Sequence, residues 1–106
     1  MRPANQQQAI RYMEYLLKRK IQGNRQTRVK EHVGRAKRIA IAIWVRFQVG
    51  PYQYKFKHLR WYMEVHIKGL AANTRYKYWL TIRHIVSALG KNAALGILFK
   101  SVRWGF

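Results

Sequence analysis

The side chains best suited to chemistry in this chain are long cations spaced along an expected helix. A segment in the first half of the chain repeats its apolar residues with the spacing of an α-helix. At 100° per residue, Arg28 and Arg35 fall together on one side of that helix. Lys30 and Lys37 fall on the other flank, and Arg38 is nearly opposite the apolar stripe. Cations of this kind neutralise phosphates and release counterions, so the pattern favours a polyanionic partner.

A second group of cations lies on another expected helix, further along the chain. Arg75, Lys77 and Arg83 lie beside or opposite its apolar stripe. Thr27 and Thr74 stand where the two basic helices begin, and there hydroxyls and nearby backbone N–H groups can contact phosphates. Base readout needs a helix with a few long donors on its exposed face. These two helices are therefore the best candidates for a binding surface.

The charge balance of the whole chain is extreme. Its 106 residues contain 22 Lys and Arg against three acids, Glu14, Glu31 and Glu64, which gives a net charge of +19. Solubility alone needs a net charge of only about 2 to 8 in magnitude. Such an excess usually indicates a nucleic-acid partner. It also repels itself and costs stability, so a bound polyanion would relieve it.

Other kinds of chemistry are poorly supported. The four histidines form no i, i+4 pair, and no cysteine or aspartate is present to complete a metal shell. Three scattered glutamates do not supply acid–base catalysis, and no glycine-rich phosphate loop is present. We therefore expect no metal, no cofactor and no small-molecule substrate. His58 and His84 are candidates for additional hydrogen bonds to phosphates.

The aromatic residues divide into two groups. Tryptophans on the apolar stripes are expected to pack in the core: Trp44, Trp61 and Trp79. A platform for single-stranded nucleic acid needs exposed rings interleaved with cations. Only three tyrosines are placed to provide one: Tyr52, Tyr54 and Tyr76.

Apolar periodicity and capping residues predict four helices. The first three cover about 6–20, 28–47 and 57–68, and the fourth runs from a polar cap at Asn73 or Thr74 to residue 89. The expected caps are polar residues before the helices and glycines after them: Asn5, Thr27, Asn73 or Thr74, Gly69 and Gly90. Gly34 lies inside the second helix and is expected to allow the close approach of another backbone, either DNA or a neighbouring helix, with helix packing favoured.

These elements predict an all-α fold: one domain over residues 1–106, built as a compact four- to five-helix orthogonal bundle of two helical hairpins. Residues 1–5 are expected to form a flexible arm. The alternating stretch 52–56 could be extended and would connect the two hairpins. Residues 92–106 are expected to form a short fifth helix or a linker, and their apolar side chains favour docking on the bundle or on a partner protein.

A resemblance to a known family rests on three stretches: GNRQTRVKEHVGRAKRI, KFKHLRWYM and KGLAANTRYKYWLTIRHI. Their order and spacing resemble the N-terminal core-binding domain of phage-type tyrosine recombinases, the integrases of prophages and integrative elements. The resemblance covers roughly residues 10–91 and implies a SAM-like fold. It implies duplex DNA as the partner, in DNA integration and recombination, with the second and fourth helices approaching the major groove. It also suggests other recombinase protomers as partners of the C-terminal apolar segment.

The resemblance and the charge pattern together indicate a set of DNA-contacting residues: Thr27, Arg28, Lys30, Arg35, Lys37, Arg38, Thr74, Arg75, Lys77 and Arg83. His32 and Arg35 also match the His-Xaa-Xaa-Arg box of the family's catalytic domain. They lie, however, in what resembles the non-catalytic domain, and the rest of the catalytic domain is absent from this chain. We therefore expect DNA binding without catalysis.

Two alternatives stay open at this stage. The charge alone equally allows an RNA-binding or ribosome-associated basic helical protein, although a compact bundle argues mildly against it. A membrane-active cationic bundle is less favoured, because apolar stripes that recur on four helices suggest that the helices bury one another. No apolar run approaches the ~20 residues of a membrane span, and no signal-peptide core is visible. We expect a cytoplasmic, nucleoid-associated protein with no membrane partner.

Overall fold

The computed structural model of the chain describes residues 2–20 and 26–90, with the side chains at positions 19, 20, 26 and 27 outside that description. The helices are α1 (Gln6–Lys20), α2 (Gln26–Phe47), α3 (Phe56–Trp61) and α4 (Ala72–Leu89). A 3₁₀ turn, η1 (Pro51–Gln53), precedes α3, and a π turn, η2 (Tyr62–His66), follows it directly. The described residues contain no strand, which confirms the predicted all-α class. The predicted fifth helix or linker over 92–106 lies outside the described residues.

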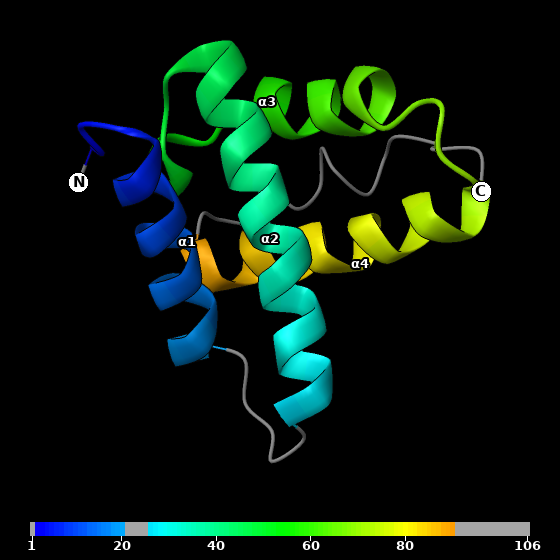
Figure 1. Cartoon of the computed structure of the whole chain (residues 1–106), viewed down its shortest axis with the longest axis horizontal. Helices are drawn as coiled ribbons and strands as arrows, with labels where there is room; N and C mark the ends of the chain where they lie inside the picture. Colours follow the sequence, from blue (N-terminus) through cyan, green and yellow to red (C-terminus); the bar gives the residue numbers. More distant parts are fainter. Residues whose placement is uncertain (1, 21–25, 91–106) are drawn as a thin grey trace.

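The helices form two hairpins that run across each other (Figure 1). In the first hairpin α1 and α2 lie side by side and run in opposite directions. In the second, α3 and α4 are joined by a turn, and α4 passes across both α1 and α2. This arrangement confirms the predicted bundle of two helical hairpins, and it makes the crossing of α2 with α4 a junction between them.

The hydrophobic core lies where the inner faces of the two hairpins meet. Met13 and Leu17 on α1, Ile39 and Ile43 on α2, and Ile82 on α4 are all fully buried. The four-residue spacing within each pair is that of one helix face. Burial of such a side chain contributes about 1.5–3 kcal/mol. The core therefore fixes which faces of α2 and α4 remain available for other contacts.

The first two helices begin close to their predicted positions. The Asn5 side-chain oxygen accepts the backbone N–H of Gln8 at 2.9 Å, which confirms Asn5 as the N-cap of α1. The second helix begins at Gln26, so Thr27 lies in its first turn and is not the cap that the sequence predicted.

The helix predicted over 57–68 is divided into two parts. The α-helix α3 gives way to the π turn, in which the Ile67 N–H bonds to the Tyr62 carbonyl oxygen at 3.0 Å, five residues back. Gly69 is not among the described residues with positive φ, so the left-handed cap predicted there is wrong. Gly90 does end α4 in the left-handed conformation, with φ of 61°.

The start of α4 also differs from the prediction. Its N-cap is Ala71, and no side chain caps it. The Arg75 N–H donates to the Ala71 carbonyl oxygen at 3.0 Å, so the helix is already established at this point. Alanine is the best helix former, and the chain enters the helix at Ala72 before it reaches Asn73 or Thr74. The predicted polar cap is therefore wrong.

The connection between the hairpins begins as a turn at Pro51–Gln53 and becomes extended at Tyr54 and Lys55, so the predicted extended stretch is confirmed only at these two residues. Pro51 opens the 3₁₀ turn because its fixed φ suits the first position of a helical turn. Tyr54 follows it and is only 1% exposed. Pro3 is also buried, and its ring occupies the space that a Cβ on Gly50 would need. Residues 2–5, predicted as an arm, thus include a residue packed against the connection.

None of the helices in residues 2–20 and 26–90 combines the length and the apolar character that a membrane crossing requires.

Candidate nucleic-acid interface

A buried threonine joins α2 to α4. Thr81 has no exposed surface, and its hydroxyl lies 3.2 Å from the carbonyl oxygen of Lys77, one turn earlier in the helix. The hydroxyl oxygen of Thr81 accepts a hydrogen bond from Arg35 Nε at 2.8 Å, and His32 Nδ1 lies 2.9 Å from that hydroxyl oxygen. His32 and Arg35 are three positions apart and so share one face of α2. One residue of α4 therefore positions two polar residues of α2.

The two histidines at this crossing are neutral near pH 7. The rings of His32 and His84 meet edge to face, with their centroids 4.4 Å apart. Burial, helped by His84 and by the positive charge of Arg35, lowers the pKa of His32 to about 4, while Glu31 opposes the shift. Burial and then the charge of Arg83 lower the pKa of His84. The positive charge of the crossing therefore comes from its arginines and lysine.

These residues surround a hollow between the two helices. Its volume is about 390 Å³, and its lining is formed by Arg28, Glu31, His32, Arg35, Lys77, Leu80 and His84. Three cations thus share this space with one carboxylate. A second hollow of about 330 Å³ continues along α4 and is lined by Leu80, Arg83, His84 and Ser87. Guanidinium and ammonium groups around an open hollow form a surface suited to phosphate oxygens. We call the residues lining these two hollows the α2–α4 surface.

Arg83 is placed on this surface by an aromatic residue. Its guanidinium carbon lies 5.0 Å from the centroid of the Trp79 ring, within the range of a cation–π contact. The Tyr76 ring stacks on the Trp79 ring, with their centroids 5.7 Å apart, and Tyr76 is 43% exposed. Tyr54, by contrast, is buried, so its predicted place on a stacking platform is wrong.

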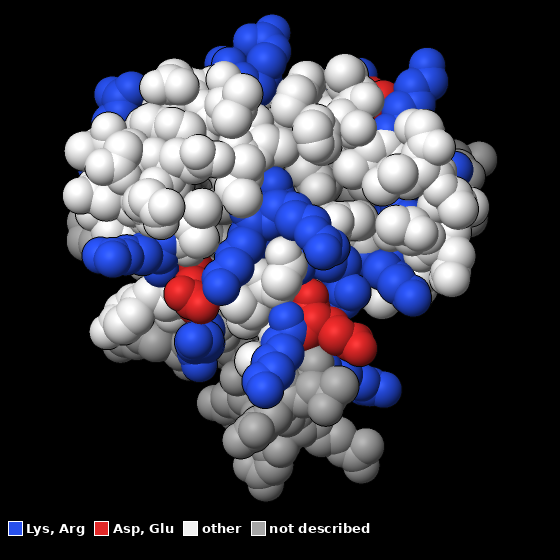
Figure 2. Space-filling view, viewed as in Figure 1, with Lys and Arg blue, Asp and Glu red and all other residues white. Residues whose placement is uncertain are grey.

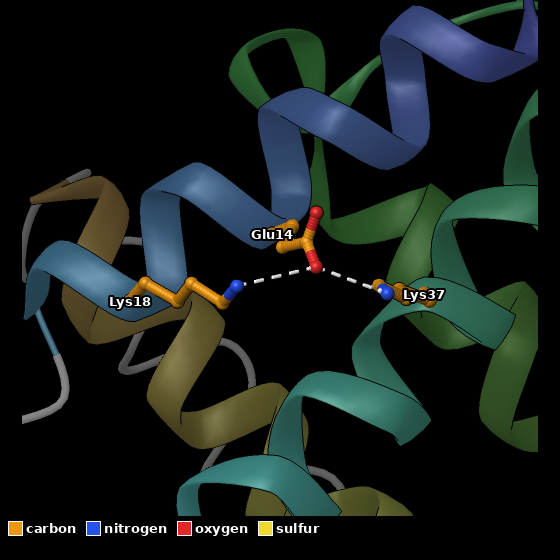
Figure 3. Close-up of polar contacts among 3 residues, drawn as sticks. All are labelled: Glu14, Lys18 and Lys37. Carbon is orange, nitrogen blue, oxygen red and sulfur yellow. Dashed lines mark ion pairs between the residues drawn. The ribbon is translucent and has the colours of Figure 1, made fainter.

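Lys37 is directed away from this surface, toward α1. Its Nζ lies 3.0 Å from a carboxylate oxygen of Glu14, and Lys18 Nζ lies 3.4 Å from the same oxygen (Figure 3). The hydrogen bond from Lys37 lowers the pKa of the Glu14 carboxyl group. This ion pair links the two helices of the first hairpin, so the structure separates Lys37 from the other predicted contacts.

Two predicted arginines also make contacts within the protein. The Arg38 guanidinium donates to the Tyr78 hydroxyl at 3.5 Å, and Arg75 Nε donates to the Leu70 carbonyl oxygen at 3.1 Å. Neither residue lines the hollows of the α2–α4 surface. The structure therefore brings together Arg28, Arg35 and Lys77, with Arg83 next to them.

The other predicted contacts lie away from the α2–α4 crossing or outside the described residues. Lys30 is exposed on α2 and Thr74 is half-buried near the start of α4, and neither lines a hollow at the crossing. The side chain of Thr27 lies outside the described residues. His58 is 4% exposed, and its Nδ1 accepts the backbone N–H of Lys55 at 2.8 Å. Because this bond caps α3 from inside the fold, the predicted contact between His58 and phosphate is wrong.

Sequence reasoning did not identify Thr81 and His32 as the residues that build the crossing. The signal was present in their spacing, because His32 and Arg35 are three positions apart, and Lys77 and Thr81 are four apart. Such spacings put each pair on one helix face. What the sequence did not give was the register that sets these two faces against each other.

Cations dominate the wider surface, and carboxylates lie among them (Figure 2). Lys and Arg side chains gather over the middle of the face in Figure 2, where α2 runs in Figure 1, and a broad surface without charged residues lies above them.

Among the described residues no group of three metal-ligating side chains comes together.

Comparison of the chain with protein-family models, curated proteins and solved structures finds no match. The resemblance to the recombinase core-binding domain therefore rests on the three sequence stretches alone.

Proposed function

We propose that this chain binds double-stranded DNA through the α2–α4 surface. The hollow at the helix crossing carries the proposal, because it gathers Arg28, Arg35 and Lys77 around one space. Arg35 is held in place by the buried hydroxyl of Thr81. Its side chain therefore loses less conformational entropy when a ligand binds. A fixed guanidinium in the same hollow as two further cations is well suited to a run of phosphates.

The charge balance supports the same function. The sequence has three acidic side chains for 22 cations, so the acids are too few to pair with most of the cations. In the described residues, the ion pairs engage Glu14 and Glu64 with three cations: Lys18, Lys37 and Arg60. None of these cations lies on the α2–α4 surface. The cations there remain available to neutralise phosphates and release counterions.

Duplex DNA is favoured over other polyanions by two considerations. The cations of this surface stand on two rigid helices, which suits the regular spacing of duplex phosphates better than a flexible strand. The resemblance to the core-binding domain of tyrosine recombinases points to DNA, and it extends the proposal to DNA integration or recombination with binding, not catalysis, as the role of this chain. RNA binding by the same cations is the competing function.

The deciding experiment compares binding of labelled duplex DNA, single-stranded DNA and duplex RNA over a salt series. For six to ten phosphate contacts on B-DNA, the logarithm of the binding constant should fall with log salt at a slope of about −5 to −9. Tighter binding of duplex DNA with such a slope is expected. Equal or tighter binding of RNA would replace the DNA function with the RNA-binding alternative.

A further inference from the structure

A large hollow lies on a different part of the molecule, between α2 and the segment formed by α3 and η2. Its volume is about 660 Å³, and its lining is formed by Arg38, Ile41, Ala42, Val45, Arg46, Trp61 and His66. It shares no residue with the hollows of the α2–α4 surface. We call it the α2–α3 groove.

The groove exists because α2 carries a second apolar stripe besides the one in the core. Position 38, the pair 41 and 42, and the pair 45 and 46 follow one another at steps of three or four residues, so they share one face along two turns of the helix. The aliphatic members of this line lie in its middle, and arginines stand at positions 38 and 46. Val45 is 68% exposed, which is unusual for a residue in the middle of an apolar line.

The apolar surface continues past Trp61. A second hollow of about 280 Å³ also has Trp61 in its lining, together with Phe56, Lys57, Arg60, Glu64 and Val65. Val65 is 62% exposed. The Trp61 ring is positioned by Phe47, whose centroid lies 5.4 Å away, edge to face. A fixed, half-buried tryptophan at the centre of an apolar strip has the character of a binding hot spot.

The charges around the groove indicate what kind of partner fits it. No carboxylate lines the larger hollow, and both of its arginines are held by aromatic residues. Arg38 donates to the Tyr78 hydroxyl at 3.5 Å, and the Arg46 guanidinium carbon lies 5.0 Å from the Phe47 ring centroid. An apolar floor between two ordered cations complements a ligand with apolar residues in the middle and carboxylates on its flanks.

Two other occupants are disfavoured by charge and chemistry. A second copy of this chain brings a net charge of +19 and only three acids, so copies repel each other. Duplex DNA is held mainly by cations that contact its phosphates, but the floor of the groove is built from Ile41, Ala42, Val45 and Trp61.

From this geometry we propose that the α2–α3 groove binds an amphipathic helix of an acidic partner protein. Apolar residues of that helix, spaced by three or four positions, lie on Ile41, Val45 and Trp61, as in helix-in-groove recognition. Asp or Glu residues at its flanks face Arg38 and Arg46. The inference is independent of the proposed DNA binding, because the two surfaces have no lining residue in common.

The test uses three synthetic peptides of about 20 residues, long enough for a helix that spans the groove. The first carries an apolar stripe flanked by glutamates. The second contains the same residues in an order that destroys the stripe, and the third keeps the glutamates but replaces the apolar residues with glutamine. Binding to the whole chain is measured by fluorescence anisotropy at about 0.3 M salt, where attraction between exposed charges is largely screened. We expect the striped peptide to bind at least about tenfold more tightly than either control.

Two protein variants then locate the contact. Val45→Asp introduces a carboxylate into the groove, and Tyr15→Asp introduces the same charge at another exposed position, on α1, where the side chain is 60% exposed. We expect Val45→Asp to remove most of the preference for the striped peptide and Tyr15→Asp to preserve it. Both substitutions are at exposed sites, and circular dichroism checks that the helices persist.

Several results would overturn this inference. Equal binding of the striped and scrambled peptides would reduce the effect to non-specific charge attraction. Equal losses in Val45→Asp and Tyr15→Asp would place the contact elsewhere. Concentration-dependent dimerisation that Val45→Asp abolishes would assign the groove to a second copy, and selective loss of DNA binding in Val45→Asp would assign it to DNA.

Discussion

Arg35 on α2 donates a hydrogen bond through Nε to the fully buried hydroxyl of Thr81 on α4, at 2.8 Å. This bond joins the two helical hairpins at the point where the cations of the α2–α4 surface gather. It ties the stability of the fold to the geometry of the proposed binding surface. A change at Thr81 is therefore expected to affect both.

The first prediction is an energetic coupling between these two residues. Thr81→Val removes the acceptor while keeping the shape of the side chain, and Arg35→Met removes the donor. Because each change breaks the same bond, the double variant should lose about 1 kcal/mol less than the sum of the single losses. The free energies of unfolding come from urea titrations. Arg28→Met combined with Thr81→Val is the matched control. The two losses in the free energy of unfolding should add in this pair, because Arg28 lies on the same surface but does not bond Thr81. Additive losses in both pairs would contradict the coupling.

The second prediction concerns acid pH. The pKa of His32 is about 4 in the folded protein against an ordinary value of 6.5, so the unfolded chain binds the proton more readily. The free energy of unfolding should therefore be fully retained above about pH 6.5 and fall as the pH is lowered toward 4. The whole shift corresponds to ~3 kcal/mol. Because the ring is only half-buried and solvent screens it, we expect a loss of about 1 kcal/mol, to which His84 adds in the same direction.

Urea unfolding at about pH 7 and about pH 5 measures this loss while the glutamates stay largely ionised. His32→Gln should flatten the pH dependence, and His66→Gln, at an exposed histidine, should leave it in place. An unchanged slope in His32→Gln would show that other groups cause the loss.

The fold was largely predictable because apolar spacing carries it. Helical periodicity alone predicts the apolar stripes that contain Met13 and Leu17 on the first helix and Ala40 and Ile43 on the second, and all four residues are buried. The helix ends were less predictable, since Asn73 and Thr74 favour a cap in isolation but the alanines before them begin α4. Local capping preferences are worth about 1 kcal/mol, so neighbouring residues and tertiary packing readily override them.

The candidate site was predicted only in part. Helical spacing placed Arg28 and Arg35 on one face of α2, and they do line one hollow. Lys37 was placed correctly around α2, yet it pairs with Glu14, because the neighbour on that flank is α1. Which helix stands next to each face depends on how the hairpins cross, and a single sequence does not record that.

The third prediction concerns Gly34 in the middle of α2. Its predicted role in close packing is wrong, because a Cβ at this position would meet nothing within 4 Å. Gly34→Ala should therefore stabilise the protein by up to about 1 kcal/mol, since alanine is the better helix former. Gly90→Ala is the matched control, and it should destabilise because Gly90 has a φ of 61°. Urea midpoints of the two variants should move in opposite directions; a loss of stability in Gly34→Ala would mean that this face of α2 is covered.

The fourth prediction separates the proposed DNA-binding surface from the overall charge of the chain. Lys77 and Lys57 are both exposed lysines that line hollows, but Lys77 lies at the α2–α4 crossing and Lys57 lies beside Trp61 on α3. Replacing either with alanine removes one positive charge. If the crossing binds the phosphates, Lys77→Ala should weaken duplex binding about fivefold and reduce the magnitude of the salt slope by about 1. Lys57→Ala should change the affinity by less than about twofold, in keeping with weak interactions between screened exposed charges. Anisotropy titrations of one labelled duplex at matched salt give both quantities, and equal losses in the two variants would mean that DNA responds to the net charge and not to the arrangement of cations around Arg35.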